Sequence, residues 1–181
     1  MTQLVAPGDL EVVRAFVNTI NLESGVDRME KPAALRAWLS EQGLLEGVAR
    51  VTAKDVELAK AVREAIRALL RANAGDDLDP DAIRVLDRAA ETTGVRLRFS
   101  ATGARLESGA GGARGAIGSL LAIVAAAMGE GTFDRMKACR EGSCLWAFYD
   151  HSKNRSRTWC SMKVCGNRTK VRSYRRRQGD D

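Results

Sequence analysis

Four cysteines near the C-terminal end constrain this chain more than any other feature of its sequence. They follow a C-x4-C, fifteen-residue spacer, C-x4-C pattern, as Cys139, Cys144, Cys160 and Cys165. Two close pairs on a hairpin-sized spacer can build a tetrahedral four-thiolate zinc site, because each pair supplies two thiolates from one tight turn. The spacing therefore predicts one structural zinc ion (Zn2+) per chain, with these four residues as ligands and no open position for water.

Two other interpretations of the cysteines are two disulfides and four unrelated buried thiols. Disulfides are typical of secreted proteins, and the N-terminal segment lacks the basic region and long apolar run of a signal peptide. Unrelated thiols do not account for the symmetric spacing. His151, the single histidine of the chain, could replace one cysteine as a ligand, but four cysteines already complete the tetrahedron.

The residues around the second cysteine pair also carry a resemblance to a known family. Residues 159–162 read WCSM and residues 165–168 read CGNR, and they are preceded by Asp150, Ser152, Asn154 and Arg155. This segment, residues 132–178, resembles the CGNR zinc finger of bacterial, largely actinobacterial, transcription regulators. The preceding region, with FVNT at residues 16–19, resembles the ABATE-type domain that usually precedes this finger. The resemblance implies a zinc-dependent DNA-binding module joined to a helical domain.

The charge of the chain is unevenly distributed. The whole chain of 181 residues has a formal net charge of +6. Residues 132–178 hold 13 Lys/Arg against 3 Asp/Glu, whereas residues 1–131 hold 16 against 18. A surface that is merely solvated mixes both signs, as residues 1–131 do, so the concentrated positive charge indicates a polyanionic partner.

Hydrophobic periodicity predicts a mainly α protein with a small β-hairpin, an α+β fold. We expect an N-terminal helical domain at residues 1–131 and a four-cysteine finger at residues 132–178. Apolar stripes predict helices over residues 9–22, 32–43, 52–73, 80–94 and 113–128. Trp38 is interpreted as a core anchor. Arg63, Arg67 and Arg71, at four-residue steps, are interpreted as a solvated stripe.

Strict alternation near residues 95–107 predicts a β-hairpin with one face packed on the helices. Within the finger we expect two short strands, at residues 145–149 and 157–159, and a basic helix from about residue 165 to 177. The longest apolar run, residues 117–128, is shorter than the roughly 18 residues that a membrane span needs. We therefore expect a cytoplasmic protein that does not associate with a membrane.

The final helix carries the candidate nucleic-acid contacts. Arg168, Arg172, Arg175 and Arg176 follow i, i+4, i+7, i+8 spacing and predict a cationic ridge that can enter the major groove. Asn167 and Arg168 lie in the first turn and could pair with adenine and guanine, or could instead brace the finger. Phosphate contacts are predicted for Lys153, Arg155, Arg157 and Lys170. Val171 and Tyr174 are expected to pack on the finger.

These observations favour a zinc-dependent DNA-binding transcription regulator. Its first domain would sense a small-molecule effector or form a homodimer. One alternative is an RNA-binding zinc module that stacks bases on Trp146 and Tyr149, and another is a protein-interaction adaptor. The sequence has no G-x-S-x-G or HExxH motif, so we expect no catalytic residues and no enzyme activity.

Overall fold

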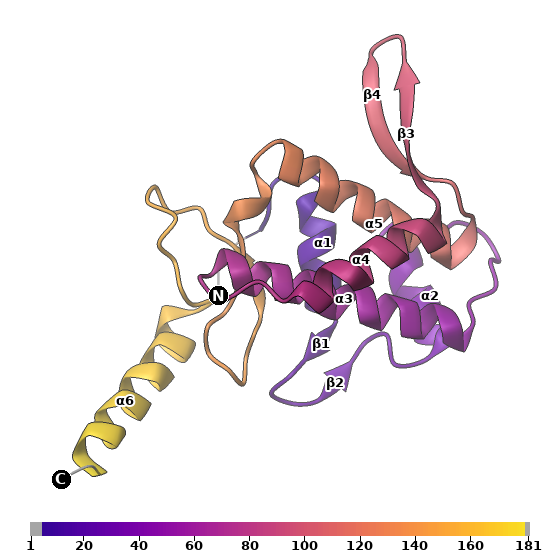
Figure 1. Cartoon of the computed structure of the whole chain (residues 1–181). Coiled ribbons are helices and arrows are strands. Elements are labelled where there is room, and N and C mark those ends of the chain that lie inside the picture. The colour runs from indigo at the N-terminus through magenta and orange to yellow at the C-terminus, as the bar shows by residue number, and fades with distance from the viewer. Residues whose placement is uncertain (1–4, 180–181) are drawn as a thin grey trace.

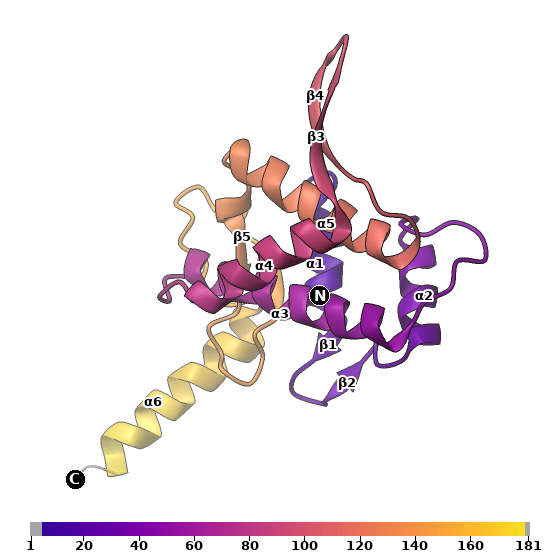
Figure 2. The same ribbon diagram turned by 45° about the vertical axis from the view of Figure 1, so that its right-hand side comes forward.

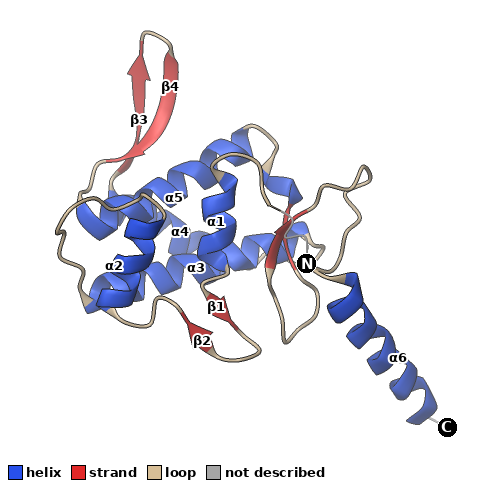
Figure 3. Ribbon diagram, turned by 180° about the vertical axis from the view of Figure 1, so that it is seen from behind, coloured by secondary structure: helices blue, strands red, loops and turns tan. Residues whose placement is uncertain are grey.

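A computed structural model describes residues 5–179 and shows a helical body from which two elements project in different directions (Figure 1). The body consists of α1 (Leu10–Val17), α2 (Pro32–Glu41), α3 (Ala53–Asn73), α4 (Pro80–Thr93) and α5 (Gly112–Gly129). A hairpin of β3 (Val95–Ser100) and β4 (Gly103–Ser108) projects at one end, and α6 (Asn167–Gly179) projects at the other (Figure 3). The predicted α+β class is confirmed.

Local sequence signals account for the helix boundaries. A capping box starts α3: the Thr52 hydroxyl accepts a hydrogen bond from the Asp55 N–H, and the Asp55 carboxylate accepts one from the Thr52 N–H. The Asp79 side chain caps α4 ahead of Pro80, and Gly94 ends this helix in the left-handed conformation with φ of 62°.

Helix α5 lies at the centre of the body. Ile117 and Leu120 are fully buried where α5 packs against α1, α3 and α4. Phe16 and Trp38 extend this core, with ring centroids 5.6 Å apart. Trp38 is buried, so its predicted role as a core anchor is confirmed.

The length of α5 corrects an expectation about apolar runs. The helix has 18 residues and is long and apolar enough to cross a membrane by length and composition alone. The predicted helix at residues 113–128 is present and runs through Gly118 and Ser119 without a break. A buried core helix passes the same test, and the packing of α5 against all four other helices of the body gives it that role here.

The first helix is shorter than predicted. It ends at Val17, and the chain continues into a small hairpin of β1 (Ile20–Asn21) and β2 (Val26–Asp27). The Asn21 side chain accepts hydrogen bonds from the N–H groups of Glu23 and Ser24, and Gly25 adopts φ of 73°. The helix has already ended, with Asn18 as its C-cap, and the Thr19 hydroxyl donates to the Phe16 carbonyl just after it, so the chain leaves the helical path before the stripe ends.

The prediction that the α3 arginines form a solvated stripe is wrong for two of the three. Arg63 and Arg67 are both buried. Arg63 donates to both carboxylate oxygens of Asp27, at 2.8 and 3.0 Å. Arg67 donates to the carbonyls of Val17 and Leu145, at 2.7 and 2.9 Å. These guanidinium groups can be buried because carboxylate and carbonyl oxygens accept hydrogen bonds from their N–H groups.

The β3–β4 hairpin forms as predicted, but most of its apolar face is not covered. Leu97 is 53% exposed and Phe99 is 81% exposed. Only the base of the hairpin is held by the body, where the Ser108 hydroxyl donates to the Thr93 carbonyl over 2.7 Å. The alternating pattern predicted the hairpin correctly, but it could not show whether a helix lies against its apolar side.

The finger contains one antiparallel strand pair, β5 (Met136–Ala138) with β6 (Ala147–Tyr149). The predicted second strand at residues 157–159 does not form, because side chains bind its polar groups. The Arg157 N–H donates to Asp150, and the Arg157 guanidinium donates to the carbonyls of Trp159 and Cys160. The segment before the first cysteine pairs with β6 instead.

The hydrophobic core continues across the predicted boundary at residue 131. Phe133, Met136 and Tyr149 are buried in the same cluster as the helices, and β5 lies against α3 (Figure 2). A second, smaller cluster surrounds the cysteines and contains Phe148. The finger therefore rests on the helical body through one of its two faces.

Candidate metal centre and nucleic-acid interface

The four cysteine sulfurs converge on one point. All four lie within 4.8 Å of one another, and the Cys144–Cys160 and Cys160–Cys165 sulfur separations are 3.6 and 3.7 Å. Zinc–sulfur bonds of about 2.3 Å in a tetrahedron place the sulfurs about 3.8 Å apart. A disulfide would bring two sulfurs to about 2.05 Å, so all four thiols are free.

The chemistry of the thiols also suits a divalent cation. Hydrogen bonding to Cys139 and Cys144 raises the pKa of Cys160, and burial raises the pKa of Cys165 to about 12. Four thiols this close cannot all ionise without a positive ion between them, because each thiolate repels the others. The site can hold one structural zinc ion, which would balance the thiolates and link the two cysteine turns.

Backbone hydrogen bonds shape both cysteine turns, and a side chain caps the second. In the first turn, Cys139 N–H donates to the Trp146 carbonyl over 2.9 Å, and Leu145 adopts φ of 45°. In the second, the Ser161 hydroxyl caps a single wide turn, η2 (Met162–Gly166), which leads directly into α6. The direction of α6 is therefore set at the metal site.

Asn18 joins the finger to the helical body. Its side-chain amide donates to the Ala147 carbonyl over 2.9 Å and accepts from the Ala147 N–H over 2.7 Å. The side chain thus provides β6 with the two bonds that another strand would make. Arg67 binds the carbonyl of Leu145 close by, and Asn73 binds the carbonyls of Phe133 and Met136.

A buried carboxylate organises the polar turn between the two cysteine pairs. Asp150 is fully buried and accepts from Lys137, from both the hydroxyl and the N–H of Ser152, and from the Arg157 N–H. Burial raises the pKa of Asp150, but the bonds from Ser152, Lys137 and Arg157 outweigh this effect and hold the pKa at about 2. Asp150 therefore stays ionised and fixes the turn that carries Lys153 and Arg155.

Glu141 fixes the base of α6. Its side chain is 1% exposed, and it accepts from Arg172 over 2.6 Å and from the Thr169 hydroxyl over 3.2 Å. The hydrogen bond from Arg172 lowers the pKa of Glu141. Since Glu141 lies between Cys139 and Cys144, it connects the first cysteine turn to the helix that follows the second.

Comparison with protein families agrees with this architecture. A family model for ABATE, described as a putative stress-induced transcription regulator, matches residues 10–130. The chain belongs to the ABATE family. A second model, the CGNR zinc finger, matches residues 135–178. No curated protein matches the chain.

Part of the predicted cationic ridge of the CGNR finger is engaged in internal contacts. Arg172 binds Glu141, and Arg168 binds Glu23 of the β1–β2 turn over 2.8 Å. Asn167 donates to the Lys163 carbonyl one turn earlier. Arg175 and Arg176 are exposed, with no ion pair among residues 5–179. The ridge thus has two parts: a base, in which Arg168 and Arg172 form ion pairs within the protein, and an outer part, in which Arg175 and Arg176 are exposed.

The predicted phosphate contacts also differ in their surroundings. Lys153 and Lys170 are exposed, and the Arg155 side chain lies 3.8 Å from Asp134. Arg157 instead braces the metal site. Its guanidinium donates to the carbonyls of Trp159 and Cys160 and lies 5.5 Å from the centroid of the Phe148 ring. Val171 and Tyr174 are exposed, so the expectation that they pack on the finger is wrong.

The aromatic residues of the CGNR finger lie inside the molecule. Phe148 and Tyr149 are buried, and Trp146 is half-buried against the cysteine cluster. Base stacking requires an exposed ring face. The position of Tyr149 therefore removes one of the two rings on which the RNA-binding alternative depended.

Several residues that build the site were missed by sequence reasoning. Asn18 was noticed only as part of FVNT, without a role, and Glu141 was overlooked between two cysteines. A clue was available for Glu141, because an acidic residue stands out in a segment with so few of them. No local signal shows that Arg67 reaches a carbonyl 78 positions away.

Proposed function

We propose that this ABATE-family protein is a zinc-dependent, duplex-DNA-binding transcription regulator that acts in the cytoplasm. The observation that carries the proposal is the position of α6. It projects from the metal site as a helix of 13 residues (Figure 3). The outer arginines, Arg175 and Arg176, are exposed. A projecting basic helix whose base is fixed by the fold has the shape of a major-groove reader.

The division of the ridge suggests a role for each arginine. Arg175 and Arg176 are available to bases or phosphates without loss of an internal bond. Arg168 and Glu23 are both substantially exposed, and exposed ion pairs contribute little to stability. Arg168 could therefore leave Glu23 for DNA. Arg172 is different, because its departure would leave the buried Glu141 carboxylate without its charged partner.

Val171 adds an apolar group to the same face. It is 49% exposed and lies on α6 between Asn167 and Arg175, one helical turn from each, in a shallow groove that Arg168 also lines. In the major groove an apolar side chain can contact the methyl group of thymine. We infer that the preferred site contains a thymine beside the bases that the arginines contact.

The proposal is tested by selecting bound sequences from a random duplex library with the zinc-loaded protein. Affinity should fall steeply as salt rises, because several cations would contact phosphates. Arg175→Ala should weaken binding by about 1–3 kcal/mol without changing stability. Arg172→Ala should lower the stability of the finger. Arg88→Ala, an exposed arginine on α4, is the matched control and should change neither quantity.

A protein without salt-dependent affinity for any duplex would refute the proposal. Binding to a protein partner through α6 would then be the surviving interpretation. We assign no catalytic role to any residue, and we propose no enzymatic activity. Among the described residues, the cysteines form the one cluster of three or more His, Cys, Asp or Glu side chains that could hold a metal.

A further inference from the structure

The β3–β4 hairpin is an arm with an uncovered apolar face. Leu97 and Phe99 lie on this face opposite Leu106 and Ala104. Two-stranded hairpins are only marginally stable in water without a partner on one face. In the described part of the chain both strands are also edges, paired only with each other. Such an arm requires a covering surface.

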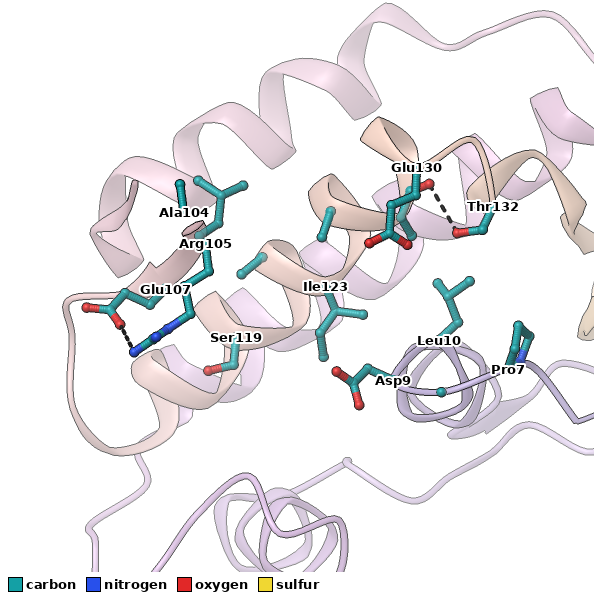
Figure 4. Close-up of a pocket in the computed structure, with 15 residues that line it drawn as sticks. Pro7, Asp9, Leu10, Ala104, Arg105, Glu107, Ser119, Ile123, Glu130 and Thr132 are labelled. Atoms are coloured by element: carbon teal, nitrogen blue, oxygen red, sulfur yellow. Dashed lines mark hydrogen bonds and ion pairs between the residues drawn. The ribbon is translucent and has the colours of Figure 1, made fainter. Parts of the chain in front are cut away.

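A groove lined largely by apolar side chains runs beside the base of the arm (Figure 4). It has a volume of about 680 Å³ and is bounded by β4, by α5 and by the start of α1. The floor along α5 consists of four small side chains, Ser119, Ala122, Ala126 and Ala127, and one larger one, Ile123. Small side chains on a helix leave room for another backbone to approach closely.

The charges of the arm and the groove are opposite. The arm carries Arg96, Arg98 and Arg105 on the face opposite Leu97 and Phe99. Its single acid, Glu107, pairs with Arg98 and Arg105, so the arm keeps a net positive charge. The groove is lined by three acids, Asp9, Glu107 and Glu130, against one arginine, Arg105 of its own β4 wall (Figure 4). Asp9 and Glu130 have no ion-pair partner among residues 5–179. The groove therefore favours a basic, partly apolar occupant, and the arm is such an element.

We propose that two copies of this chain form a dimer by placing the arm of each copy in the groove of the other. The dimensions agree: six-residue strands extend about 20 Å, and the helical segment from Ser119 to Glu130, the C-cap of α5, rises about 17 Å. Because one chain carries both halves of the contact, a two-fold axis satisfies both arms and both grooves at once. This proposal is independent of DNA binding.

The test is the mass of the full-length, zinc-loaded protein in solution, measured by sedimentation over a concentration series. Phe99→Asp should raise the dissociation constant of the dimer at least about 30-fold, as expected for a buried aromatic anchor. Val48→Asp is the matched control, because Val48 is also exposed but lies outside the arm and the groove. It should leave the dimer intact. Circular dichroism should show both variants folded.

Charge reversal tests the reciprocal arrangement directly. Glu130→Arg and Arg98→Glu should each weaken the dimer, whereas an equimolar mixture of the two variants should form a heterodimer, since each mismatched surface then meets its opposite charge. A wild-type chain that stays monomeric, or a dimer that Phe99→Asp and Val48→Asp affect equally, overturns the proposal. A mixture that remains monomeric overturns the reciprocal geometry.

Discussion

Replacing Asn18 with alanine should destabilise the helical body and the finger together. The change removes both hydrogen bonds to Ala147, which is fully buried. An unsatisfied buried N–H costs about 1–3 kcal/mol, and the lost bond to the carbonyl costs about 1 kcal/mol more. The free energy of unfolding should therefore fall by roughly 2–4 kcal/mol, a large share of the total stability of a typical domain.

Urea denaturation of the zinc-loaded protein measures this loss. Circular dichroism follows mainly the helices of the body, and fluorescence follows the tryptophans of both parts, Trp38, Trp146 and Trp159. With a slope of about 2 kcal/mol per molar urea, the midpoint should fall by about 1–2 M for both signals. Asn154→Ala is the matched control, because Asn154 is exposed, and it should shift the midpoint very little.

Two results would refute this reasoning. One is an Asn18→Ala protein whose midpoint equals that of the control, which would mean that the contact contributes nothing to stability. The other is a circular dichroism transition that stays in place while only the finger unfolds at lower urea. In that case residues 1–131 fold independently of the finger, despite the continuous core.

Four further predictions concern the metal site, the Asp150 turn beside it and Val171 on α6. Elemental analysis should find one zinc per chain, and Cys165→Ser should reduce zinc content and lower the melting temperature; full zinc occupancy in that variant would contradict the ligand set. Asp150→Asn should cost about 3–5 kcal/mol by leaving Lys137 buried without a charged partner, whereas exposed Asp134→Asn should cost little. The pKa of Asp150 is lowered to about 2, so the contribution of its carboxylate to the free energy of unfolding is present above about pH 4 and lost toward pH 2. The difference in unfolding free energy between wild type and Asp150→Asn should therefore shrink over this range. A constant difference would show that the ionised carboxylate is not what stabilises the turn. Finally, replacing the thymine of a selected site by uracil should weaken binding by wild type but not by Val171→Ala, and equal losses would show that Val171 does not contact the methyl group.

The sequence predicted features with a strong local signal. The capping box at Thr52, the proline start of α4 and the cysteine spacing each depend on a few neighbouring residues, and each is confirmed in the structure. The incorrect predictions concern long-range contacts. Periodicity could not show that Arg63 forms an ion pair with Asp27. Nor could it show that β6 pairs with β5, a strand that comes just before Cys139 in the sequence.

The candidate site was predictable in composition but not in organisation. The four candidate zinc ligands follow from spacing, whereas the braces Asn18, Glu141 and Asp150 depend on how other segments pack around them. The interpretation of Arg172 shows the difference. Helical spacing correctly places it on the ridge, but its pairing with Glu141 depends on the fold of the first cysteine turn.

The projecting α6 has a consequence for the thermodynamics of recognition. It carries Arg168, Lys170, Arg172, Arg175, Arg176 and Arg177 within 13 residues, and cations four positions apart repel one another on a helix. A helix of this length is marginal on its own in water, and among the described residues its contacts with the rest of the fold lie in its first half. A polyanion that neutralises these charges would stabilise the outer turns as it binds. Part of the binding free energy would then be used to order the helix, and the affinity would depend on temperature more strongly than the contact area alone implies.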